Sequence, residues 1–110
     1  MTFRVMLRME LVAGAGAEFE RAWRAGADTI TGQPANLGQW LCRSADEPDV
    51  YHIISDWTDE AAFRRYELSE EHLAHRVTLH PYRLRGSMAT ATVIAGLTGA
   101  AALAGAAGPA

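Results

Sequence analysis

Three side chains on one predicted helix offer the clearest chemistry in this sequence. A helical segment is expected to begin at Ser69 and to run to about His80. Within it, His72, His75 and Arg76 follow the i, i+3, i+4 spacing of a single helix face. Imidazole titrates near neutrality and guanidinium stays charged. No carboxylate in fixed register and no known zinc-site spacing accompanies the two histidines, so we expect a pocket-lining or solvated stripe and no metal.

The rest of the chain adds aromatic surface but no familiar catalytic motif. It contains three tryptophans, three tyrosines and four histidines, a supply of flat rings and near-neutral titrating groups that could enclose a planar aromatic ligand. There is no Ser-His-Asp order, no Walker loop and no haem-attachment sequence. Gly14-Ala15-Gly16 lies where a dinucleotide fingerprint would begin, but Phe19 takes the place of its third glycine, so we interpret it as a turn.

The spacing of apolar side chains predicts the strands and helices that position these residues. Along the chain it changes between a period of two residues, typical of a strand, and a period of 3.6, typical of a helix. Thr58 is the expected N-cap of a helical segment over 59–68, and Ser69 is the expected N-cap of the segment over 70–80. The predicted elements are a strand over 3–11, a helix from about 19 to 30, strands over 37–43 and 50–57, helical segments over 59–68 and 70–80, and a strand over 83–94.

This βαββαβ order predicts an α+β, ferredoxin-like fold with helices on one face of a four-stranded sheet. The other face would be exposed, so we expect a homodimer in which a second copy covers it. Residues 1–94 would form this domain, and the uncharged, Ala/Gly-rich residues 95–110 a C-terminal tail. We interpret that tail as mobile or lying against a partner subunit, and we expect no membrane span.

Composition narrows the class of partner. A chain of 110 residues holds one domain. Its formal net charge is -3, with ten scattered arginines and no lysine, which argues against a nucleic-acid partner and excludes lysine-based covalent chemistry. The single cysteine, Cys42, forms no internal disulfide, and the N-terminus shows no secretory pattern. We therefore expect a cytoplasmic protein with a small-molecule partner.

One stretch of the sequence resembles a known family. The run from Asp49 to Phe63, together with later positions, is similar to the core of the antibiotic biosynthesis monooxygenase family; those positions are Tyr66, Ser69, His72 and Leu79-His80-Pro81. The resemblance covers roughly residues 1–94. It implies a dimeric α+β barrel with a pocket in each subunit and, for members that tailor aromatic polyketides, oxygenation by molecular oxygen without metal, flavin or haem.

The resemblance also implies roles for individual residues. Trp57, Arg76 and His72 would be catalytic: an aromatic wall, a partner for an oxyanion, and a base. Tyr51, Phe63, Tyr66 and His75 would contact a planar polycyclic phenol, and His75 is the alternative base. Each has a structural alternative: Trp57 as a core aromatic, Arg76 as a surface residue paired with an acid such as Glu71, the histidines as exposed helix residues, and the tyrosines as simple packing.

Two departures keep other functions open. Anthrone-oxidising members carry an asparagine four residues before the tryptophan, where this chain has Ile53. Haem-degrading relatives carry an asparagine and a histidine where this chain has Leu7 and Arg76, which argues against haem degradation. The expected function is cofactor-independent oxidation of an anthrone- or naphthacenone-type intermediate to a quinone. The second hypothesis is an aromatic polyketide cyclase, which the opening strand also resembles, and the third a non-catalytic accessory or ligand-binding dimer.

Overall fold

The structure is a computed structural model that describes residues 1–107. Its element order contains the predicted βαββαβ core. The elements are β1 (Phe3–Leu11), α1 (Gly16–Ala25), α2 (Asp28–Thr31), β2 (Asn36–Arg43), β3 (Val50–Trp57), α3 (Glu60–Glu67), α4 (Glu70–Leu79), the short 3-10 helix η1 (His80–Tyr82), β4 (Arg83–Thr92) and α5 (Ala100–Ala107).

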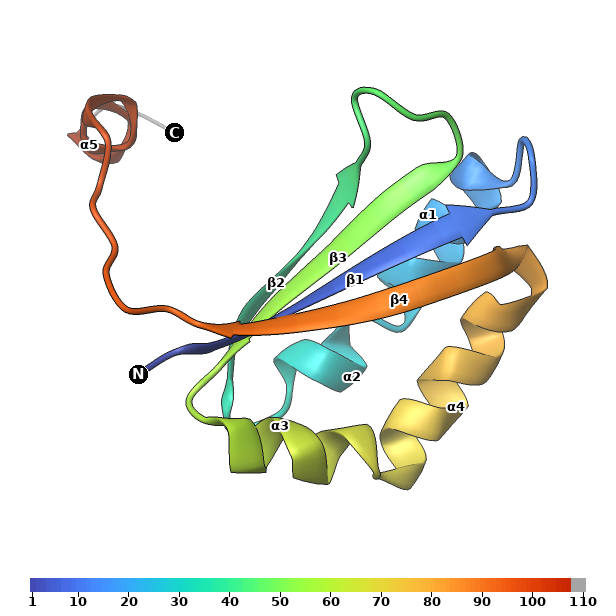
Figure 1. Ribbon diagram of the computed structural model, residues 1–110, viewed down its shortest axis with the longest axis horizontal. Helices are drawn as coiled ribbons and strands as arrows, with labels where there is room; N and C mark the ends of the chain where they lie inside the picture. Colours follow the sequence, from blue (N-terminus) through green and yellow to red (C-terminus); the bar gives the residue numbers. More distant parts are fainter. Residues whose placement is uncertain (108–110) are drawn as a thin grey trace.

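The four strands form one antiparallel sheet in the order β2-β3-β1-β4. Helices α1 to α4 cover a single face of that sheet (Figure 1). This arrangement confirms the predicted α+β, ferredoxin-like fold. Because strand side chains alternate between faces, the in-register pairs Phe3↔Trp57 and Leu7↔Ile53 both point toward the helices.

The buried core on the helix side consists of two clusters. One lies toward α1 and contains Met9, Leu11, Phe19, Tyr51, Ile53 and Leu79. The other lies toward α3 and contains Phe3, Val5, Trp57, Phe63 and Tyr66. Leu7, at the middle of β1, packs against both clusters. The buried core therefore has two parts, one toward each end of the strands, which meet at Leu7.

The predicted helix over 19–30 is broken at Gly26 into α1 and α2. Glycine is a weak helix former, and the backbone at Gly26 departs from helical geometry, with a φ of -107°. The imidazole of His75, on α4, occupies the space where a side chain of residue 26 would lie. The apolar spacing alone did not predict the break because the stripe continues to Ile30 in α2.

The cap of α3 is Asp59 and not Thr58, which corrects the prediction. A carboxylate oxygen of Asp59 accepts a hydrogen bond from the Ala62 N–H at 2.8 Å. The Thr58 N–H instead donates to the Ala35 carbonyl at 2.9 Å, so Thr58 belongs to the preceding loop. Ser69 caps α4 as predicted, since its hydroxyl accepts from the His72 N–H at 3.2 Å.

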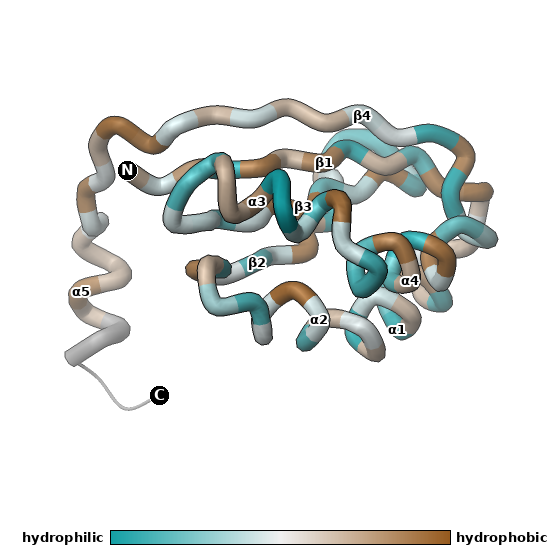
Figure 2. The backbone as a smooth tube through the Cα atoms, turned by 90° about the horizontal axis from the view of Figure 1, so that it is seen from below, coloured by the Kyte–Doolittle hydropathy of each residue, from teal (hydrophilic) through white to brown (hydrophobic). Residues whose placement is uncertain are grey.

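The last strand ends at Thr92 and not at Ile94, because Thr92 pairs with Phe3, the first residue of β1. A chain in extended form leads from there to α5, which stands apart from the helices on the sheet (Figures 1 and 2). The predicted tail over 95–110 thus includes a short helix, and its residues 108–110 lie outside those described. Within residues 1–107, no helix combines the length and apolar character that crossing a membrane requires.

The sheet face opposite the helices carries a continuous apolar row. Trp40, Ile54, Met6 and Ala89 are register partners across all four strands, and Trp40 is 49% exposed. A row of this kind on an uncovered face fits the expected homodimer, which stays a prediction.

Candidate active site

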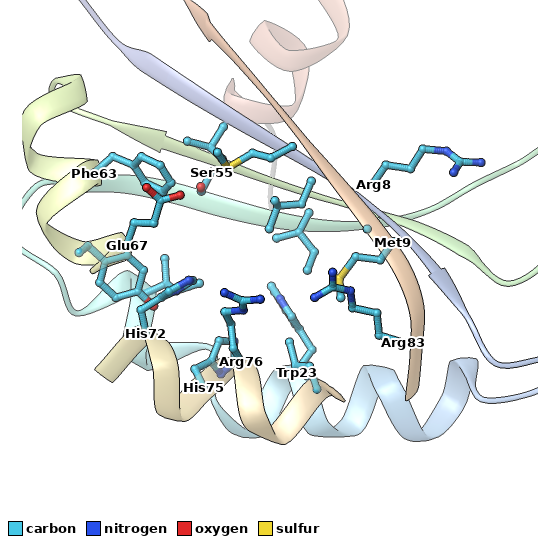
Figure 3. Close-up of a pocket in the computed structure, with 18 of the residues that line it drawn as sticks. Arg8, Met9, Trp23, Ser55, Phe63, Glu67, His72, His75, Arg76 and Arg83 are labelled. Atoms are coloured by element: carbon cyan, nitrogen blue, oxygen red, sulfur yellow. The ribbon is translucent and has the colours of Figure 1, made fainter. Parts of the chain in front are cut away.

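A cavity of about 250 Å³ lies between the sheet and its helices, where the two core clusters meet (Figure 3). Its walls are mostly apolar. The aromatic, polar and charged residues in its wall, together with Ile53, include Trp23, Ser55, Trp57, Phe63, Tyr66, His72, His75, Arg76 and Arg83. A cavity of this kind, apolar with a few converging polar groups, is the usual form of a small-molecule site.

Trp57 and its neighbours form an aromatic wall. The ring of Trp57 is 1% exposed, stacks on Tyr66 at 5.2 Å between centroids and meets Phe63 edge-on at 5.5 Å. Its Nε1–H donates to the Ser55 hydroxyl at 3.0 Å. The same ring is therefore a core residue and part of the cavity wall, so the two alternatives from the sequence are not exclusive. Ser55 accepts this bond and keeps its own proton to donate.

Three buried polar atoms on residues that line the cavity have no hydrogen-bond partner within residues 1–107. They are the Tyr66 hydroxyl, His72 Nδ1 and Trp23 Nε1. Folded proteins rarely leave such atoms unpaired, because each costs about 1–3 kcal/mol. Each of these atoms also has almost no accessible surface, so a ligand in the cavity reaches one only if the side chain that carries it turns.

The two histidines of α4 are buried or half-buried in the wall. Burial lowers the pKa of His72, and the nearby Arg76 guanidinium lowers it further. Burial also lowers the pKa of His75, whose ring is 7% exposed. Both imidazoles are consequently neutral at neutral pH and able to accept a proton. The ring of His72 meets Tyr66 edge-on at 5.1 Å, and burial raises the pKa of the Tyr66 phenol to about 12, so that phenol remains a donor.

Arg76 is exposed and lines the cavity from the last turn of α4. It forms no ion pair with any residue in the part of the chain described. The suggested partner Glu71 instead accepts a hydrogen bond from the Gln33 amide at 2.7 Å. The structure thus brings Arg76 and His72 to the same cavity with the guanidinium unpaired.

Of the seven residues selected from the sequence, only Tyr51 does not line this cavity. Its ring packs on Phe19 at 5.2 Å in the other core cluster. Its hydroxyl donates to the carboxylate of Glu20 and accepts from Arg43 Nε at 3.3 Å. Tyr51 is six residues from Trp57 along β3, roughly 20 Å in a strand, so the two point to the same face but lie at different ends of it.

The wall residues that were not selected from the sequence include Trp23, Ser55 and Arg83. Trp23 shares its helix stripe with Phe19, and this pattern is typical of core packing. Ser55 alternates with Trp57 in β3, which could have identified it. Arg83 lies at the first position of β4, and no spacing marks it. Among residues 1–107, no group of three or more histidine, cysteine or carboxylate side chains is placed to hold a metal ion.

Comparisons with known proteins agree with this geometry. The model of the antibiotic biosynthesis monooxygenase family matches residues 2–77. SchA of Streptomyces halstedii is 32% identical over 84 residues, and a 42.8 kDa protein of the whiE locus of Streptomyces coelicolor is 30% identical over 70 residues. The matches cover 76% and 64% of this chain but only 22% and 18% of those proteins, so the chain spans about a fifth of their length.

Among solved structures, SnoaB of Streptomyces nogalater, described as a cofactor-independent oxygenase, superposes with a TM-score of 0.77 and 27% identity. The superposition covers 87% of this chain and 96% of that one. Most of the fold is therefore shared with that structure.

Proposed function

The chain belongs to the antibiotic biosynthesis monooxygenase family, and from this premise we propose that it is a cofactor-independent monooxygenase acting on a polycyclic phenolic polyketide intermediate. The product is a quinone and molecular oxygen is the co-substrate. Support comes from the described activity of SnoaB and from the whiE-locus relative.

The observation that carries the proposal is the apolar cavity with unpaired polar atoms at its edge. Fused rings fit against Trp57 and Phe63, which stand edge to face. The hydroxyl and carbonyl oxygens of a phenolic ring system would supply partners for the Tyr66 hydroxyl and His72 Nδ1, which are buried and unpaired here, once those side chains turn toward the ligand. A ligand of this kind satisfies both types of surface at once.

The chemistry needs a base and a dry site. Neutral His72 removes a proton from the anthrone, and the resulting anion is electron-rich enough to transfer an electron to oxygen. The radical pair combines to a peroxide anion at the former CH₂ carbon, and the protonated His72 returns its proton to give the hydroperoxide. Loss of water then leaves a carbonyl there, so one oxygen atom enters the quinone and the other leaves as water.

Arg76 and Tyr66 stabilise the anion. A guanidinium at the mouth of the cavity favours the enolate over the neutral ring system, and a phenol whose pKa is raised to about 12 donates a hydrogen bond without losing its proton. The surrounding aromatic rings exclude water from the buried Tyr66 hydroxyl and so strengthen its interaction with the anion, whereas Arg76 acts from an exposed position.

One observation favours a second candidate, the cyclase. Ile53, 5% exposed, lines the cavity in β3, and no asparagine or glutamine side chain does so among the described residues. An amide that assists oxygen activation is therefore missing from the position expected in anthrone-oxidising members. Aldol closure needs only the base and the anion partner, which His72 and Arg76 also provide.

An oxygen electrode separates the two candidates. The chain, treated with a chelator, is mixed with a dihydroxyanthrone, and oxygen uptake is compared with the spontaneous rate in buffer. We expect accelerated uptake with quinone formed in equal amount. Arg76→Gln should slow it, whereas Arg21→Gln, on an exposed helix position away from the cavity, should not. Uptake at the buffer rate would refute the oxygenase, and turnover of a polyketide substrate without oxygen would favour the cyclase.

A further inference from the structure

The charges around the cavity are not balanced. Four charged residues line the cavity, namely Arg8, Glu67, Arg76 and Arg83, but the side chain of Arg8 points away from it toward the open face of the sheet (Figure 3). Arg8 is paired with two glutamates at 2.7 Å each, and Glu67 is paired with an arginine of α3 at 3.2 Å. Arg76 and Arg83 have no ion-pair partner anywhere in residues 1–107. Two positive charges therefore remain at this site.

A β-bulge places Arg83 on the cavity side of the sheet. The register between β1 and β4 shifts after Glu10↔Arg85, so that Leu11 pairs with Arg83 and Leu84 is passed over. Without the shift, Leu84 would pair with Leu11 on the helix side and Arg83 would point to the open face. As a result Leu84 is 66% exposed while Arg83 is half-buried, the reverse of what hydrophobicity alone favours.

The side chain of Arg83 passes close to the backbone of Gly86. Its Nε lies 3.2 Å from the point that a Cβ at Gly86 would occupy, so the guanidinium crosses β4 where the chain has no side chain. Figure 3 shows the guanidinium groups of Arg76 and Arg83 both turned toward the cavity. Arg76 comes from the end of α4 and Arg83 from the start of β4, and η1 connects the two elements.

We propose that Arg83 and Arg76 together bind a carboxylate carried by the aromatic substrate. This inference rests on the proposed function and specifies its substrate class: a polycyclic phenol with an acid group at the ring edge nearest the two arginines. A planar guanidinium matches a carboxylate with two parallel hydrogen bonds, and an anion so placed removes the charge imbalance. The oxidised carbon then lies deeper, near the unpaired atoms of Tyr66 and His72.

The test compares two ligands that differ only in the acid group. A dihydroxyanthraquinone and the same ring system with a ring carboxylate are titrated into the full chain, and their Kd values are measured by calorimetry. We expect the carboxylate to bind about tenfold more tightly, the lower part of the range for hydrogen bonds to charged groups. The preference should weaken with added salt, because the site is partly open to solvent.

Variants identify the residue that binds the carboxylate. Arg83→Gln should abolish most of the preference, and Arg83→Lys should keep part of it. Arg21→Gln is the matched loss of charge away from the cavity and should keep the full preference. Equal affinities in the unmodified protein, or an unchanged preference in Arg83→Gln, would overturn the proposal.

The binding experiment is independent of turnover. If the protein prefers the carboxylate but consumes no oxygen with an anthrone, the oxygenase proposal fails and the arginine pair stands. If it consumes oxygen but shows no preference, the arginine pair fails and the oxygenase stands.

Discussion

Substitution of Gly26 by alanine tests how the cavity wall is built where α1 breaks. A Cβ at this position would lie 2.7 Å from Cε1 of His75 and closer still to its Nδ1. Both contacts are far shorter than real Cβ contacts. The His75 ring is only 7% exposed, so it can yield only toward the cavity that it lines. The φ of -107° at Gly26 is open to alanine, so the collision is the only source of strain.

The size of the effect follows from two opposing contributions. Inserting a methyl group into a packed site costs about 1–3 kcal/mol. Alanine recovers at most about 0.5–1 kcal/mol relative to glycine in a helix, and less at a helix end such as this one. We therefore expect Gly26→Ala to lower the free energy of unfolding by about 1–2 kcal/mol, since overpacking exceeds the propensity gain. In a domain of 60–100 residues, each kcal/mol shifts the Tm by about 4–8 °C.

A double-mutant cycle with His75→Ala, followed by chemical denaturation, isolates the contact. In the His75→Ala background, the added methyl group meets no ring, so Gly26→Ala should be neutral or stabilising there. If Gly26→Ala leaves the unmodified protein as stable as before, or if the two changes add without coupling, the reasoning that places His75 against the helix break is refuted.

Three further outcomes are expected. Tyr66→Phe removes a buried unpaired hydroxyl, so the free protein should be at least as stable in denaturation while calorimetry shows weaker binding of a hydroxyanthraquinone; a clear loss of stability would contradict this. Trp57→Ala should lower the free energy of unfolding by about 3–5 kcal/mol. Trp57→Phe should fold normally and have a lower kcat. If both Trp57→Phe and Arg76→Gln keep the original kcat, the assigned site is wrong. Because His72 and His75 have lowered pKa values, the unfolded chain binds more protons below about pH 6.5, and the free energy of unfolding should fall as pH falls from that point. Denaturation across this pH range should show the fall, and His75→Gln should reduce it.

The sequence predicted the sheet well because its strands have one buried face. Phe3, Val5 and Met9 alternate with polar residues, and this period sets the direction of every side chain on β1. Trp57 ends β3 on the same face, and Ser69 marks the start of α4 by its capping side chain. These are local signals, each readable within a few residues.

The parts of the site that the sequence did not predict depend on contacts between distant segments. The break at Gly26 involves His75 from another helix, and the inward position of Arg83 follows from a bulge set by pairing with β1. Tyr51, which the family resemblance suggested, lies on the same face as Trp57, but the position of the cavity along the strand depends on where the two core clusters meet. Periodicity gives the face of a residue and not its depth along the sheet.

If this cavity directs molecular oxygen onto the carbon of a bound anthrone without a bound cofactor, the oxygen atoms can be followed directly. Oxygen of heavy isotope is supplied to the chelator-treated protein with a dihydroxyanthrone, and the label is followed by mass spectrometry. We expect one labelled atom in each quinone molecule and the other in water, at a rate above that in buffer and reduced in Trp57→Phe. Quinone without label, or label entering only at the spontaneous rate, would contradict this expectation.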